Sequence, residues 1–204
     1  ILNVESTHGV VLTEAEFKLM VTLAEHIGLA IGRARLYADL QRRNNILSAL
    51  EQATLVLMKN LDLNDALQSI LSQAAQLLNT KHAYIYLLEP DNEAIKVVLG
   101  TGVFFESIGN TLKRNDGMAG KVWQSGQALN LADYHEWDGR SILYESTPFH
   151  AVVGVPLRSE ERVVGVLGLA HLEPGLTFSP ADVDLINHFA DLASIAFENA
   201  HLYT

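Results

Sequence analysis

The sequence contains no cysteine among its 204 residues. This absence excludes disulfide bonds, thiolate zinc sites, cysteine nucleophiles and cofactors linked through a thioether. It is compatible with a reducing compartment, and we expect the protein to be cytoplasmic.

Basic residues and long apolar runs are also scarce. Lys and Arg number 14 against 24 Asp and Glu, which gives a formal net charge of −10. Phosphate binding needs clustered Lys and Arg, so we expect no nucleic-acid partner. The apolar runs are too short to cross a bilayer and no basic-then-apolar leader opens the chain, so we expect no membrane contact. The hydrophobic share of 49% is nevertheless ample for a buried core.

The sequence repeats itself at its two ends in diverged form. Ile1–Ser6 and Thr13–Tyr37 match Val166–His171 and Ser179–Tyr203. Both copies read as a short apolar strand, a loop with glycine, and a helix opened by a Ser or Thr cap. A repeat present once at each end indicates that the chain starts inside the tail of one domain and then carries a complete second one.

The repeat predicts three parts. Residues 1–37 are the closing strand and helix of a preceding domain, 38–60 a connecting signalling helix, and 61–204 a complete domain. Tandem arrays of small domains joined by helices usually relay signals. The strand Ile1–Ser6 has lost its own sheet, so we expect it to pair with a sheet edge here or in a neighbouring molecule, or to pack on the helix after Thr13.

A long helix is predicted from Thr13 to about Met58. Thr13 and Glu16 form a capping box, and the span contains no proline. Asn44–Asn45 is where we expect a break. Apolar residues then recur at alternating steps of four and three, as in a coiled-coil seam: Leu36, Leu40, Leu47, Leu50, Leu57 and Leu61, interrupted by Arg43 and Thr54. The seam predicts a parallel homodimer through the helices; beyond Leu50, packing of the helix on its own domain remains open.

The remaining chain predicts an α+β fold, with helices packed on one face of an antiparallel sheet. The expected helices and strands are 64–78 (helix), 83–88 and 95–99 (hairpin), 117–124 (helix), 128–131 (strand), 151–157 and 163–170 (hairpin), and 179–203 (helix).

The stretch from Leu61 to Tyr203 resembles a GAF domain, the small-molecule-binding module of many sensor proteins. Its motifs are Leu61-Asp62-Leu63, Gly117-Met118-Ala119-Gly120-Lys121-Val122-Trp123, Asn130-Leu131-Ala132-Asp133-Tyr134, Val153-Gly154-Val155-Pro156-Leu157 with Val164-Gly165-Val166-Leu167-Gly168-Leu169, and Ser179-Pro180-Ala181-Asp182. By the same resemblance, residues 1–37 look like the end of a preceding GAF domain.

The resemblance implies a pocket between the sheet and a cover of loops and short helices, roughly residues 103–148. Apolar walls with a few polar groups suit a small ligand, although ordinary packing under a long loop has the same composition. The ligand-binding candidates are Tyr84, Tyr86, Phe105, Trp123, Asp133, Trp137, Arg140, Tyr144 and His150. Arg140 would pair with an anionic ligand or, equally, with Asp133 or Asp138.

Other chemistries are disfavoured. The acidic loop 133–138 has no second histidine at a ligand spacing for a metal, and haem ligation through His150 alone is a weak reading. Bilin attachment and methionine-sulfoxide reduction, both known in this family, need cysteines. No cyclic-nucleotide signature or catalytic arrangement is recognisable, so we expect no enzyme, and the cofactor stays unknown.

The leading hypothesis is therefore a regulatory GAF sensor of an unidentified small molecule. It would be linked to an upstream GAF domain and to a downstream output domain, a sensor histidine kinase or a cyclic-dinucleotide enzyme. The alternative is a ligand-free GAF spacer that serves dimerisation.

Overall fold

The computed structural model describes the backbone of residues 13–57 and 63–202, and the side chains of 13–36, 42 and 63–200. Its contacts divide the chain into two compact units, Ile1–Ser48 and Ala49–Thr204, which are described separately below. The expected strand Ile1–Ser6 lies outside the described residues, and so do the side chains of Leu40 and Leu47 in the predicted seam.

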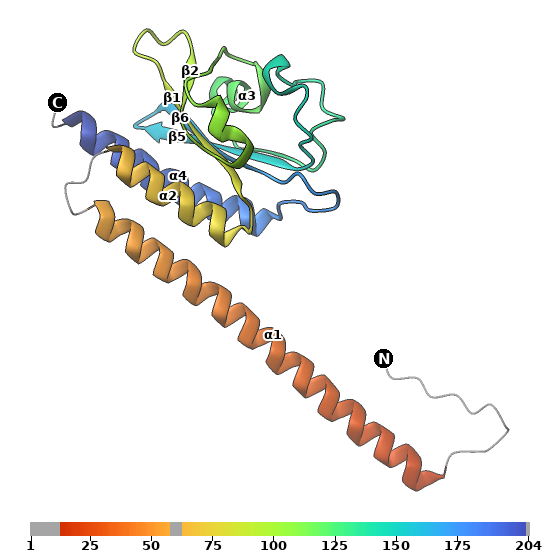
Figure 1. Cartoon of the computed structure of the whole chain (residues 1–204). Helices are drawn as coiled ribbons and strands as arrows, with labels where there is room; N and C mark the ends of the chain where they lie inside the picture. The colour runs from red at the N-terminus through yellow and green to blue at the C-terminus, as the bar shows by residue number, and fades with distance from the viewer. Residues whose placement is uncertain (1–12, 58–62, 203–204) are drawn as a thin grey trace. The chain divides into compact units, whose positions relative to one another are not determined.

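Helix α1 spans Glu14–Leu57 (Figure 1). It begins with the predicted capping box. Thr13 N and Thr13 Oγ1 donate to Glu16 Oε2 at 2.8 and 2.7 Å, and Glu16 N donates to Thr13 Oγ1 at 3.4 Å. The Thr13 hydrogen bonds favour the carboxylate and lower the pKa of Glu16. The predicted break at Asn44–Asn45 is wrong: the helix continues through both residues. Each Asn costs at most about 0.7 kcal/mol of helix propensity relative to Ala. Neither proline nor glycine stands beside the two asparagines.

Large apolar side chains of α1 are exposed to solvent. They are Phe17, Leu19, Val21, Leu23, Ile27, Leu29, Ile31 and Leu36. None of the described helices combines the length and the apolar character that crossing a bilayer requires.

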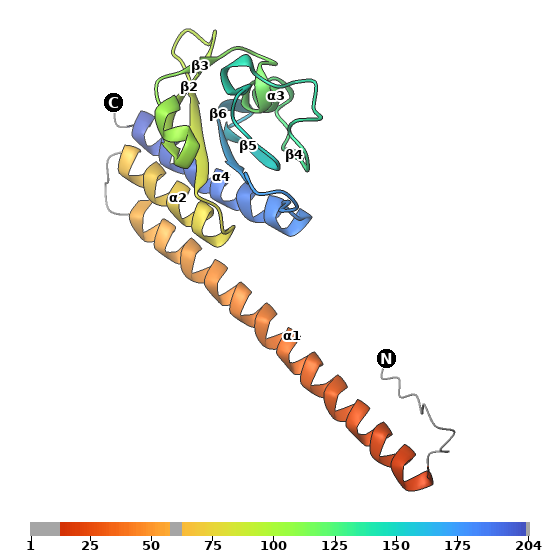
Figure 2. The ribbon, with the colours of Figure 1, turned by 45° about the vertical axis from the view of Figure 1, so that its right-hand side comes forward.

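The second unit contains a six-stranded antiparallel sheet with the order β3-β2-β1-β6-β5-β4 (Figure 2). The strands are β1 His82–Leu88, β2 Ile95–Thr101, β3 Thr111–Leu112, β4 Leu129–Leu131, β5 Val152–Ser159 and β6 Arg162–Ala170. The strands β1 and β6 pair at the centre, so the two predicted hairpins lie side by side.

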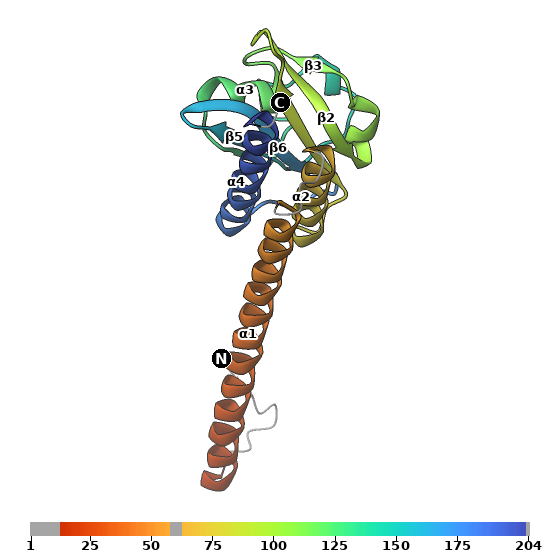
Figure 3. The ribbon, with the colours of Figure 1, turned by 90° about the vertical axis from the view of Figure 1, so that its left-hand side faces the viewer.

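Two helices cover one face of this sheet: α2, Leu63–Leu77, and α4, Pro180–Leu202 (Figure 3). The buried side of α2 includes Leu67, Ile70 and Leu71, and α4 buries Ile186 and Phe189. The start of α4 repeats the bonding pattern of α1, because Ser179 Oγ and Ser179 N both donate to Asp182 Oδ2, at 2.7 and 2.8 Å.

The opposite face is covered by α3, Gly117–Ser125, and by loops that contain two short 3-10 helices, η1 (Gly102–Ser107) and η2 (Ile142–Tyr144). Helix α3 ends at Gly126, whose left-handed φ of 65° lets its N–H donate to Val122 O at 2.8 Å. The predicted α+β fold, with helices on one face and loops and short helices on the other, is confirmed. The elements β3, η1 and η2 were not predicted, since two- to six-residue segments leave no periodic pattern.

Candidate functional site

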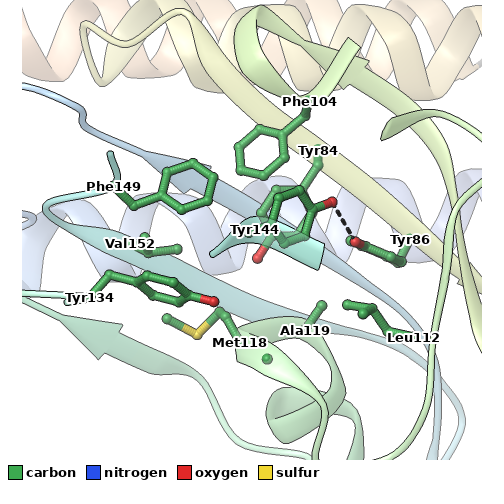
Figure 4. Close-up of a pocket in the computed structure, with 11 residues that line it drawn as sticks. Tyr84, Tyr86, Phe104, Leu112, Met118, Ala119, Tyr134, Tyr144, Phe149 and Val152 are labelled. Atoms are coloured by element: carbon green, nitrogen blue, oxygen red, sulfur yellow. Dashed lines mark hydrogen bonds between the residues drawn. The ribbon is translucent and has the colours of Figure 1, made fainter. Parts of the chain in front are cut away.

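A small cavity lies between the sheet and its loop cover (Figure 4). It is lined by Tyr84, Tyr86, Phe104, Leu112, Gly117, Met118, Ala119, Tyr134, Tyr144, Phe149 and Val152. The centre of a water molecule can occupy about 20 Å³ of it, which is room for about one water. The side chains of the protein therefore fill most of the space.

Two tyrosines of β1 form the floor of the cavity. Side chains alternate along a strand, so Tyr84 and Tyr86 point to the same face of the sheet. The ring of Tyr84 lies against Gly168 of β6, its register partner: a Cβ placed at Gly168 would be 2.8 Å from Tyr84 Cε1. Beside it on β5, Gly154 leaves room for Met118 of α3, whose Cγ would lie 3.2 Å from an added Cβ. The two glycines bring the aromatic floor and α3 close to the sheet.

The rings around the cavity contact one another mostly edge to face. Phe104 stacks on Phe149 with centroids 5.2 Å apart, and Tyr84 meets Phe104 edge-on at 4.6 Å. Tyr144 meets Phe104 and Phe149 edge-on, at 5.7 Å each, and Tyr134 meets Phe149 at 5.4 Å. Such pairs add stability beyond the area they bury, so the lining is held in a defined arrangement.

The four tyrosine hydroxyls of the lining differ in their partners. Tyr86 Oη and Tyr144 Oη share a hydrogen bond of 2.8 Å, and Tyr134 Oη accepts one from Ser141 N at 3.2 Å. Tyr84 Oη is buried and has no partner among the described residues. Burial raises the pKa of Tyr84, Tyr86 and Tyr134, so these hydroxyls stay protonated.

No charged side chain belongs to the lining of this cavity. The nearest charges act from a distance. The pKa of Tyr86 is raised mainly by burial and next by the neighbouring Tyr144. Asp116, at the start of α3, raises it further by a smaller amount. Burial is the main cause that raises the pKa of Tyr134. The Arg140 guanidinium lowers that pKa and is the smallest of the contributions.

Three of the nine predicted binding residues line the cavity: Tyr84, Tyr86 and Tyr144. Phe105 does not, because 68% of its surface is exposed, and its neighbour Phe104 points inward instead. Successive residues of a 3-10 turn point about 120° apart, so only one of two adjacent phenylalanines in η1 can face the cavity.

Trp123 is buried, but it lies outside the cavity lining. It contributes instead to a separate open groove with Leu88, Asn92, Arg162 and Val163, and the guanidinium of Arg114 lies 4.0 Å from the centre of its ring.

The other four predicted residues belong to the cover and do not line the cavity. Asp133 is exposed, and its Oδ1 accepts from His135 N at 2.8 Å, which makes it a local turn residue. Trp137 is half-buried against the Tyr134 ring, and Arg140 is exposed. His150 is half-buried, and its N donates to His171 O at 2.9 Å.

The binding-residue prediction omitted eight residues of the lining: Phe104, Leu112, Gly117, Met118, Ala119, Tyr134, Phe149 and Val152. Most are apolar, and a search weighted toward polar and charged side chains passes over them. The glycine-bounded segment 117–120 was a usable signal, since it places α3 against Gly154.

Within the part of the chain that the structure describes, His, Asp and Glu side chains nowhere form a group of three that could hold a metal ion. The cavity is small, and its lining is neutral and aromatic, with a few hydroxyls.

Comparison with known families identifies the class. The family model described as GAF domain matches residues 60–198, and the chain therefore belongs to the GAF family.

Three solved structures illustrate the range of proteins that share the fold. The GAF domain of a phosphoenolpyruvate-protein phosphotransferase from Acinetobacter is 23% identical, with a TM-score of 0.68 over 78% of this chain and 96% of that one. A free methionine-R-sulfoxide reductase from Neisseria meningitidis, in complex with its substrate, is 18% identical with a TM-score of 0.68. The match covers 78% of this chain and 92% of that one. Residues 122 to 287 of a methyl-accepting chemotaxis protein are 18% identical with a TM-score of 0.66. The match covers 74% of this chain and 98% of that one.

At these identities the likeness establishes the fold alone. Family membership makes the chain a domain of the regulatory and sensory type found in signalling proteins.

Proposed function

We propose that this GAF domain is the sensory unit of a multidomain signalling protein and that it binds a small molecule in the cavity over β1. The observation that carries this proposal is the buried hydroxyl of Tyr84, which faces a partly empty aromatic cavity without a hydrogen-bond partner. Leaving a buried hydroxyl unpaired costs roughly 1–3 kcal/mol, and such a cost is tolerated where a ligand supplies the partner.

Relay of the ligand state would run through the helices. The repeat of residues 13–37 by 179–203 extends to the capping bonds, since Thr13 with Glu16 and Ser179 with Asp182 make the same three contacts. Apolar positions of α1 such as Leu19 and Leu23 correspond to Leu185 and Phe189 of α4, which are buried, whereas those of α1 are exposed. This contrast supports an upstream GAF domain that covers α1, and a homodimer formed through the helices.

The output would be a downstream domain such as a sensor histidine kinase or a cyclic-dinucleotide enzyme, in the cytoplasm. We propose no catalysis by this domain, because the chain has no cysteine and its cavity has no charged lining. Turnover of free methionine sulfoxide by the purified protein would contradict this.

A second candidate, a ligand-free spacer that serves dimerisation, is favoured by the small free volume of the cavity. A thermal-shift screen with metabolites on the full chain separates the two. A ligand at a hundredfold excess over its Kd stabilises the protein by about 2.7 kcal/mol. A shift that Tyr84→Phe weakens supports sensing in this cavity, and a flat response across a broad screen supports the spacer.

A further inference from the structure

We propose that the ligand of this cavity is a neutral, planar ring compound with a hydroxyl group, and that it binds by replacing the ring of Tyr144. This inference rests on the proposed function, since it names the ligand class of the same cavity and the residue that yields to it.

The lining itself sets the charge of the ligand. It contains six aromatic rings and no Lys, Arg, Asp, Glu or His. A carboxylate or phosphate moved into such a site would lose its hydration without gaining a cationic partner, at a cost of several kcal/mol. A neutral ring loses little hydration and gains edge-to-face contacts with Phe104 and Phe149.

Tyr144 already occupies the place that such a ring would take. Its ring meets Phe104 and Phe149 edge-on at 5.7 Å each, and its hydroxyl reaches Tyr86 at 2.8 Å (Figure 4). A phenol therefore fits these contacts in shape and in hydrogen bonding. With 9% of its surface exposed, Tyr144 is also the least buried of the six rings, which range from 1% to 3% otherwise.

Beyond its packing contacts, segment 141–147 makes one hydrogen bond to described residues outside 134–149, and a side chain makes it. The other hydrogen bonds of residues 141–147 stay within 134–149. Tyr144 N donates to Ser141 O, Thr147 N to Tyr144 O, and Ser141 N to Tyr134 Oη. The exception is the hydrogen bond that Tyr144 Oη and Tyr86 Oη share. Its neighbours Ile142 and Leu143 are exposed, at 88% and 44%, so they do not anchor η2 from outside.

Displacement of Tyr144 would leave both buried hydroxyls of β1 available. Tyr86 would lose its present partner, and Tyr84 has none. The hydroxyl of a phenolic ligand would take the place of the Tyr144 hydroxyl beside Tyr86. A carbonyl or second hydroxyl on the ligand would pair with the hydroxyl of Tyr84. The ligand would thereby move η2, which gives the cavity a direct effect on the outer surface of the domain.

The test uses p-cresol, which has the ring and hydroxyl of a tyrosine side chain, and compares it with toluene and benzoate. Calorimetric titration of the full chain should show p-cresol binding at least about tenfold tighter in Tyr144→Ala than in wild type, because no ring must be displaced. Toluene should gain less, because the Tyr86 hydroxyl stays unpaired. Benzoate should not bind detectably. Equal p-cresol affinity in both proteins, or a preference for benzoate or for tetramethylammonium, would overturn the proposal.

Two further variants keep the test decisive if Tyr144→Ala folds poorly. Tyr144→Phe keeps the ring and loses only the bond to Tyr86, so p-cresol should bind roughly two- to tenfold tighter than in wild type. Ile142→Ala changes the exposed neighbour on η2 and should leave the affinity unchanged. An unchanged affinity in Tyr144→Phe, or an equal gain in Ile142→Ala, would contradict replacement of Tyr144.

The ligand class proposed here and the sensor function can fail independently of each other. If a charged metabolite binds in the cavity, the domain is a sensor and the ligand class proposed here is wrong. If p-cresol enters Tyr144→Ala but no metabolite shifts the wild type, the cavity chemistry holds and the spacer function replaces the sensor.

Discussion

The hydroxyls of Tyr86 and Tyr144 lie 2.8 Å apart and join the floor of the cavity to its cover. Tyr86 is 1% exposed and Tyr144 is 9% exposed, so the two ends of this bond differ in their access to water. The bond joins residues 58 positions apart in the chain, and it links η2 to β1.

This difference makes the two phenylalanine variants unequal. Tyr144→Phe leaves the buried Tyr86 hydroxyl unpaired and should lower the free energy of unfolding by about 1–3 kcal/mol, while Tyr86→Phe should cost only about 0.5–1.5 kcal/mol. The double variant should be more stable than the sum of the two losses implies. Urea unfolding of all four proteins measures this, and strict additivity would show that the hydroxyls do not interact.

Removal of the unpartnered hydroxyl should not weaken the domain. We expect Tyr84→Phe to leave the free energy of unfolding unchanged or to raise it by up to about 1 kcal/mol, because a buried polar group without a partner is lost. Urea unfolding is again the measurement. A loss of more than about 1 kcal/mol would mean that a water bound in the cavity pairs with the hydroxyl.

Gly168 is predicted to be intolerant of a side chain. A methyl group there would lie 2.8 Å from Tyr84 Cε1 and closer still to Cζ and Oη. Overpacking of this kind costs about 1–3 kcal/mol, so Gly168→Ala should lower the melting temperature of the domain. Gly28→Ala is the control, since an added Cβ on α1 meets nothing within 4 Å. A wild-type melting temperature in Gly168→Ala would show that Tyr84 moves aside freely.

Stability should fall at acid pH through His82 and His171. Burial lowers the pKa of both, and a nearby Glu173 opposes the shift in each. A pKa below the unfolded value of about 6.5 gives a contribution that is present above that pH and lost as the pH falls through the folded pKa. Protonation of His82 at Nδ1 would also remove the acceptor for Val103 N, at 3.3 Å.

Melting temperatures measured from about pH 8 to about pH 5 should therefore decline below about pH 6.5. The decline should be smaller in the double variant His82→Gln and His171→Gln. His26→Gln, on the exposed surface of α1, is the control and should follow the wild type. An undiminished decline in the double variant would assign the acid sensitivity to other groups.

The helix seam predicts a dimer that two substitutions can break. Replacing Leu40 and Leu47 with Asp puts charge into the expected interface and should yield monomers in sedimentation. Matched replacements of Arg33 and Arg35 with Gln, on the exposed part of α1, should leave the oligomeric state unchanged. A double Asp variant with the oligomeric state of the wild type would place any interface elsewhere, for example on α4.

The sequence by itself determined the longer helices and strands and the layer arrangement. Alternation in 83–88 and the helical period in 64–78 reflect burial of one face, and the Thr13 and Ser179 caps are local bonds, so each signal lies within a few residues. The GAF motifs then ordered these elements into the family fold, and the family match over residues 60–198 agrees.

Only the tertiary structure decided which side chains form the cavity. Phe104 and Phe105 are equivalent in sequence, and the 3-10 turn of η1 turns one inward and leaves the other 68% exposed. Tyr144 reaches Tyr86 because of how the cover folds back onto β1. These outcomes depend on contacts between segments far apart in the chain, and no local periodicity encodes them.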